Sequence, residues 1–285
     1  MTGKTSPQPD NTAIRTALWR ALHLLADSEP HILKDDLGLK LAAPGDDWRQ
    51  RPDMSPFTRP FRASILARAR FVEDFVQKMA ASQITQYVIL GSGLDTFAFR
   101  HPELNTQLKI FELDQPGPQE WKKQRLEELN LAVPANLVFV PHDFESDRPW
   151  LESLSSHGFD INTPAVVAST GVSMYLTREA NFSTLQEAAK LAPGSSFISS
   201  FMVPMEMVDP EIRTGVERAA AGAKANGTPW LSHFTPDAMV DLALRAGFKE
   251  ARHISSGFLA QEYFSGRTDG LRPPASAEEL LLAST

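Results

Sequence analysis

The chain has 285 residues, of which 42% are hydrophobic and 22% charged, which suffices for one large α/β domain or two small ones. Its net charge of −7 provides no broad basic surface, so nucleic acid is not an expected partner. The absence of cysteine excludes disulfides, thiolate nucleophiles and zinc–cysteine sites. Neither a signal-peptide core nor a run of membrane-spanning length is present, so we expect a cytoplasmic protein without a membrane partner.

The first 85 residues predict a tail followed by helices. Residues 1–11 are polar, contain two prolines and are predicted to be disordered. Leu18, Leu22 and Leu25 recur at helical spacing within residues 12–42, and the proline-rich residues 43–60 are typical of a loop. The segment FRASILARARFVEDFVQKMA that follows carries apolar side chains at helical spacing, which predicts a long, partly buried helix.

From residue 86 onward, short apolar runs alternate with helical segments, which indicates βαβ units and a mainly parallel sheet. The expected strands are residues 87–91, 108–113, 137–141, 165–169 and 196–202, and the expected helices are residues 95–101, 117–129, 147–157, 178–191 and 235–246. Two further strands, 248–254 and 258–264, are expected to form a terminal hairpin around Ser255, Ser256 and Gly257.

A glycine-rich loop follows the first expected strand in YVILGSGLDTFAFR, residues 87–100. Gly91 and Gly93, with Ser92 between them, permit a tight turn and a close approach of the backbone to a ligand. The dinucleotide fingerprint has a third glycine at the position of Thr96, which counts against NAD and FAD. An ordinary strand–helix turn is the alternative interpretation.

An acidic pair ends the second expected strand, about twenty residues after the loop. Glu112 and Asp114 are two residues apart on that strand and therefore point the same way. Asp114 lies at the carboxyl end of the strand, where open α/β sheets bind ligands, so we expect its carboxylate to accept hydrogen bonds from ribose hydroxyls. The alternative is a solvated carboxylate at a strand end.

Four segments together resemble the leucine carboxyl methyltransferase family, a branch of the class I S-adenosylmethionine-dependent methyltransferases. They are GSGLDTFAFR, FELDQP, VPHDF and ASTGVSMYL, in this order. The likeness begins at ALWRALHLLADSEPHILKDD, includes ARARFVEDF and ends with QEYFSGRTDGLRPPASAEELLLA. The chain is most similar to the bacterial members, which include polyketide O-methyltransferases.

The resemblance implies a Rossmann-like sheet of seven strands with the last strand antiparallel. It also implies an N-terminal helical cap over residues 12–85 and a core over residues 86–285 that binds S-adenosylmethionine. By similarity, Gly91 and Gly93 approach the methionine part, Asp114 binds the ribose, Asp143 accepts from the adenine amine, and Phe144 covers the adenine ring. A helix or turn cap is the alternative role for Asp143.

The resemblance also places an arginine against the carboxylate of S-adenosylmethionine, at the position of Arg68. A guanidinium suits this role because it binds carboxylates with two hydrogen bonds. Arg70 competes for it, but lies on roughly the opposite face of the helix, and Arg20 is a weaker candidate. Family members commonly carry glutamate where this chain has Thr170, whose hydroxyl is still able to bind the amino group of the cofactor.

The expected reaction is methyl transfer to a carboxylate or hydroxyl of a small molecule. A carboxylate, with a pKa near ~4, is ionised at neutral pH and needs no base, whereas a phenol or alcohol benefits from one. Tyr175 and His233 are the candidate acceptor-side residues, and the insertion at residues 204–234 is expected to shape the acceptor pocket. The histidines show no metal-ligand spacing, so no metal is expected.

Two other functions fit parts of the sequence. A nicotinamide-dependent oxidoreductase fits the loop and the acidic pair, but Thr96 opposes it. A cofactor-binding protein without catalysis is suggested by Thr170.

Overall fold

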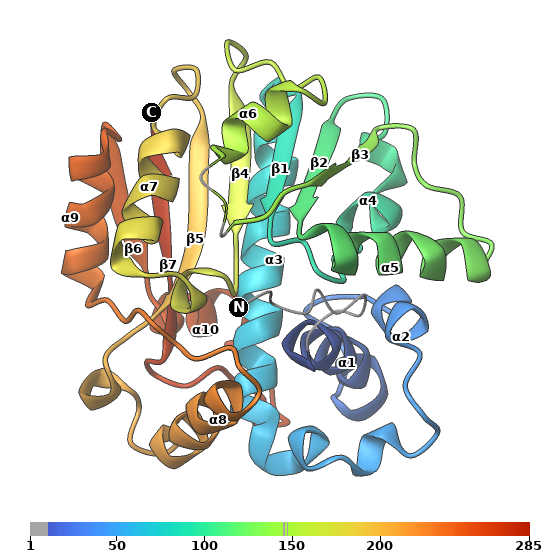
Figure 1. Ribbon diagram of the computed structural model, residues 1–285. Coiled ribbons are helices and arrows are strands. Elements are labelled where there is room, and N and C mark those ends of the chain that lie inside the picture. Colours follow the sequence, from blue (N-terminus) through green and yellow to red (C-terminus); the bar gives the residue numbers. More distant parts are fainter. Residues whose placement is uncertain (1–10, 145, 147) are drawn as a thin grey trace.

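The computed structural model describes residues 11–144, 146 and 148–285. They form one seven-stranded sheet with the strand order β3-β2-β1-β4-β5-β7-β6 (Figure 1). Neighbouring strands from β3 to β5 pair in parallel, and β7 pairs antiparallel with both β5 and β6. The bounds are β1 (Gln86–Leu90), β2 (Lys109–Asp114), β3 (Leu137–Pro141), β4 (Ala165–Ser169), β5 (Ser196–Met202), β6 (Glu250–Ile254) and β7 (Glu278–Ser284).

Helices cover both faces of the sheet, so the central strands β1, β4 and β5 are buried on both sides. One face packs on α6 (Trp150–Ser155), α7 (Arg178–Ala188) and α9 (Pro236–Ala246). The other face packs on α3 (Arg59–Ala81), α4 (Phe97–Arg100) and α10 (Ser256–Phe264). The helix α5 (Pro116–Glu128) follows β2 and contacts β3.

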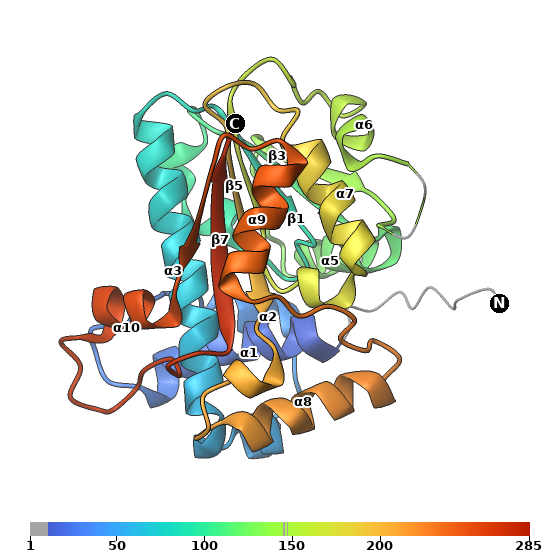
Figure 2. The same cartoon turned by 90° about the vertical axis from the view of Figure 1, so that its left-hand side faces the viewer.

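Three helices lie beyond the carboxyl ends of the parallel strands, at the bottom of Figure 1. They are α1 (Asn11–Ala26), α2 (Leu37–Ala42) and α8 (Arg213–Ala225). The long helix α3 runs from this layer to the back of the sheet and connects the two parts (Figures 1 and 2). The layer thus stands over the edge at which open α/β sheets bind their ligands.

The predicted α/β fold with seven strands and one antiparallel strand is confirmed, but the terminal hairpin is wrong. Residues 258–264 belong to α10, whose first turn is capped by Ser255: its hydroxyl accepts from the Phe258 N–H at 3.0 Å. The antiparallel strand is β7, Glu278–Ser284, inserted between β5 and β6. The segment FLAQEYF has a spacing compatible with either structure, and the N-cap decides for the helix.

The other predicted strands agree with the structure within two residues. Several helices are shorter than expected; α6 begins at Trp150, and residue 147 lies outside the described residues. Residues 1–10 of the predicted tail also lie outside them, and Asn11 already belongs to α1. Within the described ranges, no helix combines the length and apolar character that crossing a membrane requires.

Candidate functional site

The glycine loop connects β1 to α4 and adopts a backbone that side chains disfavour. Gly91 and Gly93 have φ angles of 68° and 48°. A Cβ atom on Gly91 would lie 2.6 Å from Cγ2 of Val172, so the loop after β4 already occupies that space. The backbone N–H groups of Gly91 and Ser92 donate to the Leu113 carbonyl at 2.9 and 3.1 Å, which ties the loop to the end of β2.

Asp114, the last residue of β2, lies where the loop and this strand meet. Its carboxylate accepts a short hydrogen bond from the Gly93 N–H and one of 2.7 Å from the Gln115 N–H. The side chain remains partly exposed. The expected ribose-binding carboxylate therefore stands at the strand end, beside the backbone of the glycine loop.

The end of β3 brings the two expected adenine-side residues next to Asp114. The backbone N–H of His142 donates to the Asp114 carbonyl at 2.8 Å, and Asp143 and Phe144 follow directly. Asp143 is exposed, whereas Phe144 is partly buried and its ring meets that of His142 edge-on at 4.8 Å. An exposed aspartate and a partly buried phenylalanine thus follow the end of β3, next to Asp114.

Arg68 lies beside the loop after β4. A Cβ atom on Gly171 would be 2.9 Å from Nη2 of Arg68, so the guanidinium packs directly on this glycine. Arg70 is directed elsewhere, to Asp74 at 2.7 Å and the Ile32 carbonyl at 3.2 Å. Of the two competing arginines, Arg68 is the one that faces this edge of the sheet.

Glu278, which the sequence analysis did not single out, forms an ion pair with Nη1 of Arg68. The two side chains are 11% and 13% exposed. Glu278 is the first residue of β7, and its place opposite Met202 of β5 puts it at the carboxyl edge of the parallel strands. Thr170 is partly exposed and directly precedes Gly171, on which the Arg68 guanidinium packs. Through its ion pair with Arg68, the carboxylate of Glu278 is therefore present near Thr170, where the family resemblance predicts a glutamate.

Glu112, the other member of the acidic pair, is fully buried and does not reach the surface. Its Oε2 atom lies 2.5 Å from Nζ of Lys122 on α5, which is also fully buried. Burial raises the pKa of Glu112 to about 7, and the neighbouring Lys122 limits the rise. The alternation of side chains along a strand predicted that Glu112 and Asp114 share a direction, but it did not predict that one would be buried and the other partly exposed.

A cavity of about 460 Å³ lies within the predicted 204–234 insertion. It is an open pocket lined by residues of the 3-10 turn η6 (Met205–Met207), of α8 and of the segment 229–233. Apolar side chains dominate its wall, to which Glu206, Lys224 and His233 add polar groups. The apolar lining residues are Pro204, Met205, Ala220, Ala221, Pro229 and Trp230.

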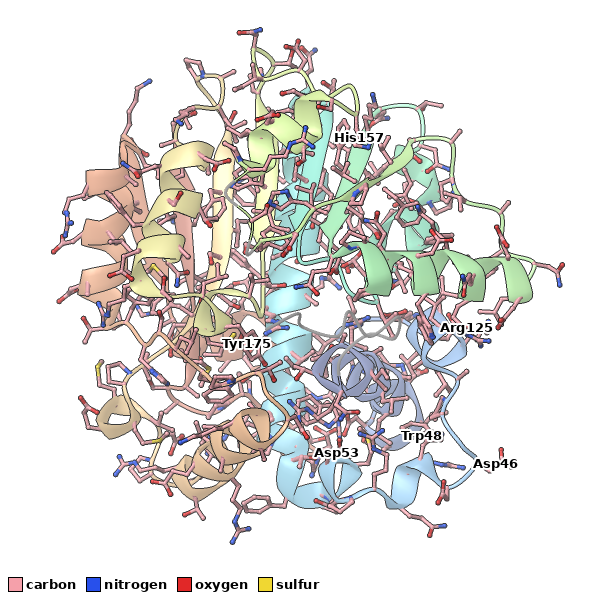
Figure 3. All side chains as sticks on the ribbon, in the orientation of Figure 1. Asp46, Trp48, Asp53, Arg125, His157 and Tyr175 are labelled. Carbon is pink, nitrogen blue, oxygen red and sulfur yellow. The ribbon has the colours of Figure 1, made fainter. Side chains whose placement is uncertain are left out.

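Hydrogen bonds attach this cavity to the segment that follows β4. The Leu231 N–H donates to the Met174 carbonyl at 2.6 Å, and the Ser232 hydroxyl donates to the Leu176 carbonyl at 2.6 Å. Tyr175 lies between these acceptors, in the turn η5 (Ser173–Tyr175), and is partly buried (Figure 3). The two predicted acceptor-side residues, Tyr175 and His233, therefore come from segments that are bonded to each other.

His233 is partly buried at the cavity wall, with its ring centroid 6.3 Å from that of Trp230. Burial and the nearby Arg178 lower its pKa, against a smaller opposing influence of Glu206. The imidazole is therefore neutral at pH 7. Across residues 11–144, 146 and 148–285, no group of three or more potential side-chain ligands is arranged to hold a metal ion.

The strand order, the antiparallel seventh strand and the glycine loop beside Asp114 define the class I methyltransferase fold. Two solved structures share this fold over nearly their whole length. A DUF574-family protein from Streptomyces avermitilis gives a TM-score of 0.61 at 13% identity, covering 97% of this chain and 98% of its own. A candidate methyltransferase from Thermobifida fusca gives 0.59 at 17% identity, covering 98% and 96%.

The chain belongs to the leucine carboxyl methyltransferase family, which residues 13–189 match. YktD of Bacillus subtilis (strain 168), named as a candidate S-adenosyl-L-methionine-dependent methyltransferase, is 37% identical over 207 residues, covering 72% of this chain and 67% of YktD. A similarly named Mycolicibacterium paratuberculosis protein is 34% identical over 190 residues, 65% of this chain. The matched part spans 61% of that relative, less than two thirds of its length. The protein is thus an S-adenosylmethionine-dependent methyltransferase.

Proposed function

We propose that this enzyme transfers a methyl group from S-adenosylmethionine to an oxygen atom of a small, largely apolar molecule, and that this oxygen belongs to a hydroxyl group. The observation that carries the proposal is the place of His233 on the wall of a mainly apolar pocket, where burial lowers the pKa of its imidazole. A neutral imidazole near the acceptor is suited to removing a hydroxyl proton. That the reaction takes place in the cytoplasm stays a prediction from the sequence.

The residues at the carboxyl edge of the sheet fit the methyl donor. The donor's methionine part would approach the backbone of the Gly91–Gly93 loop, and Asp114 offers its carboxylate to the ribose. Arg68, whose guanidinium packs on Gly171 in the loop after β4, would bind the amino-acid carboxylate. Asp143 and Phe144 would receive the adenine, the first through a hydrogen bond and the second through ring contact.

The sulfonium of the bound donor supplies an already activated methyl group, so the protein has to orient the acceptor and exclude water. The apolar wall around Met205 and Trp230 would hold the acceptor. His233 would take the hydroxyl proton as the new carbon–oxygen bond forms, while the carbon–sulfur electron pair returns to sulfur. Release of that proton to solvent would then restore the neutral imidazole.

A carboxylate acceptor is the second candidate, and Lys224 favours it. Its ammonium group is the cation among the cavity-lining residues and would attract an anionic substrate. A carboxylate requires no base, so His233 would then contact the acceptor without moving a proton.

A panel of phenols, alcohols and carboxylic acids, assayed for formation of S-adenosylhomocysteine, tests both candidates. For hydroxyl methylation, His233→Ala is expected to lower kcat by about 100-fold and to remove the ascending limb of the pH profile. For carboxyl methylation, kcat of His233→Ala stays near wild type and Lys224→Ala raises KM instead. Binding of S-adenosylhomocysteine without turnover of any acceptor would support a binding protein and oppose both proposals.

A further inference from the structure

A fully buried ion pair lies directly beneath the glycine loop and has no part in the proposed reaction. Nζ of Lys122 and Oε2 of Glu112 are 2.5 Å apart, and the two side chains are 1% and 0% exposed. The pair joins α5 to β2, two residues before Asp114. Oε1 of Glu112 has no hydrogen-bond partner among the described residues, so the carboxylate is oriented mainly by the lysine.

Lys122 also reaches the glycine loop itself. Its ammonium group donates to the backbone carbonyl of Asp95 at 2.7 Å. The same ammonium group also lies over the Phe139 ring, 5.8 Å from the ring centroid. Asp95 closes the turn of the loop: its N–H donates to the Ser92 carbonyl at 2.8 Å, and its Oδ1 accepts from the Phe97 N–H at 2.8 Å. One lysine side chain thus connects the loop to both α5 and β2.

Stability alone does not account for such a pair. Removing two charges from water is costly, and apolar side chains of similar volume often give equal or greater stability in the same place. The pair does something that apolar side chains would not do, because only a donor is able to hold the Asp95 carbonyl. A glycine-rich loop needs such a restraint, since glycine gives the backbone the greatest freedom.

We propose that Lys122, with Glu112 as its counter-ion, is a positioning residue that holds the glycine loop in the conformation that receives S-adenosylmethionine. This inference rests on the proposed placement of the donor beside Gly91 and Asp114. A loop that is already ordered loses less conformational entropy when the ligand binds, and the affinity is higher for that reason. Lys122 touches neither donor nor acceptor and acts through the backbone at Asp95.

Calorimetric titration with S-adenosylhomocysteine, combined with thermal unfolding, tests the proposal. Lys122→Met is expected to weaken binding about tenfold, equivalent to about 1.4 kcal/mol. The double variant Glu112→Leu/Lys122→Met provides the decisive comparison, because it leaves no buried charge unpaired. We expect it to recover the wild-type Tm while its affinity for S-adenosylhomocysteine stays about tenfold reduced.

Arg125→Met is the matched control. Arg125, labelled in Figure 3, lies one turn further along α5 than Lys122. It pairs with Glu128 and donates to the carbonyls of Leu41 and Lys40, which belong to α2 and not to the glycine loop. The affinity of Arg125→Met for S-adenosylhomocysteine should equal that of wild type. Wild-type affinity in the double variant would overturn the positioning role, whereas failure of the wild-type protein to bind would instead reject the proposed donor site.

Discussion

Asp114 accepts hydrogen bonds from the backbone N–H groups of Gly93 and Gln115 while its side chain stays partly exposed at the end of β2. Asp114→Ala is expected to weaken binding of S-adenosylhomocysteine at least about tenfold, because charge-assisted hydrogen bonds contribute about 1.5–3 kcal/mol each. Calorimetry measures the loss, and circular dichroism checks that the variant is folded. Unchanged binding by a folded Asp114→Ala protein would reject the ribose role.

Arg68 offers a second test at the level of a single side chain. Arg68→Ala should weaken S-adenosylhomocysteine about tenfold and leave adenosine almost unaffected, because only the former has the amino-acid carboxylate. The variant also leaves Glu278 without its cation, so Tm is expected to fall. Comparing S-adenosylhomocysteine with adenosine on the same variant separates the lost contact to the ligand carboxylate from the lost stability. Equal losses of affinity for both ligands would contradict the carboxylate contact.

Glu112 predicts a pH dependence of stability. Its pKa is raised to about 7 in the folded protein, mainly by burial, with Lys122 opposing and Asp95 and Asp114 adding to the rise. The folded state therefore binds this proton more tightly than the unfolded state, and the free energy of unfolding falls as pH rises from about 4.5 towards 7. Urea unfolding of wild type and of Glu112→Gln between pH 4.5 and 7 measures this change in the free energy of unfolding. The free energy of unfolding of the variant should depend less on pH. The same pH dependence in both proteins would contradict the assignment of the effect to Glu112.

At the level of elements, the C-terminal region shows how a local pattern misleads. The sequence FLAQEYF has apolar residues that suit a strand, yet the chain forms α10 there and places the following apolar run, EELLLAS, in β7 between β5 and β6. Leu280, Leu281 and Leu282 are all buried because helices cover both faces of the sheet. Such a continuous apolar run is typical of a central strand.

The N-cap of α10 gives this element a direct test. Ser255→Ala removes the hydroxyl that accepts from the Phe258 N–H, and is expected to lower the free energy of unfolding by about 1 kcal/mol. Urea denaturation measures the change. Ser255→Asp should preserve the stability, because aspartate caps as well as serine. A negligible effect of Ser255→Ala would contradict the capping role of its hydroxyl.

Across the whole molecule, a buried charge network attaches the N-terminal helices to the glycine loop. Nε of Arg20 on α1 pairs with Asp35 at 2.6 Å, and its Nη2 donates to the Leu94 carbonyl of the loop at 2.8 Å. Burial would raise the pKa of Asp35, but Arg20 and Arg100 together hold it below its usual value. The Arg20 guanidinium therefore links the helical layer to the glycine loop.

Loss of that link should loosen both parts without affecting the sheet. Arg20→Met is expected to accelerate amide hydrogen exchange in α1 and in residues 92–97, while the protection of β4 and β5 stays unchanged. Arg51→Met, which removes a partly exposed ion pair with Asp53 in the same layer, is the control. A uniform acceleration over the whole chain would indicate general destabilisation and contradict a specific link.

The sequence predicted correctly those features of the structure that depend on a short stretch of the chain. The strands up to β5 could be located because buried parallel strands form apolar runs that end in turn residues, and Gly91 and Asp114 mark two such ends. Glu278 and Lys122 could not be assigned to the site, because their partners, Arg68 and the Asp95 carbonyl, are far away along the chain. No periodicity or spacing signals a pairing of that kind.

The sequence by itself determined the α/β class, the number of strands, the family and the positions of the residues expected to bind S-adenosylmethionine, since each of these can be recognised from short segments of the chain. Only the tertiary structure decided which of Arg68 and Arg70 faces the sheet edge, that Glu112 is buried while Asp114 is not, and that the antiparallel strand is Glu278–Ser284. These outcomes depend on which distant segments cover a side chain. Burial and pairing arise when the chain packs, and the residues next to a side chain in sequence do not determine them.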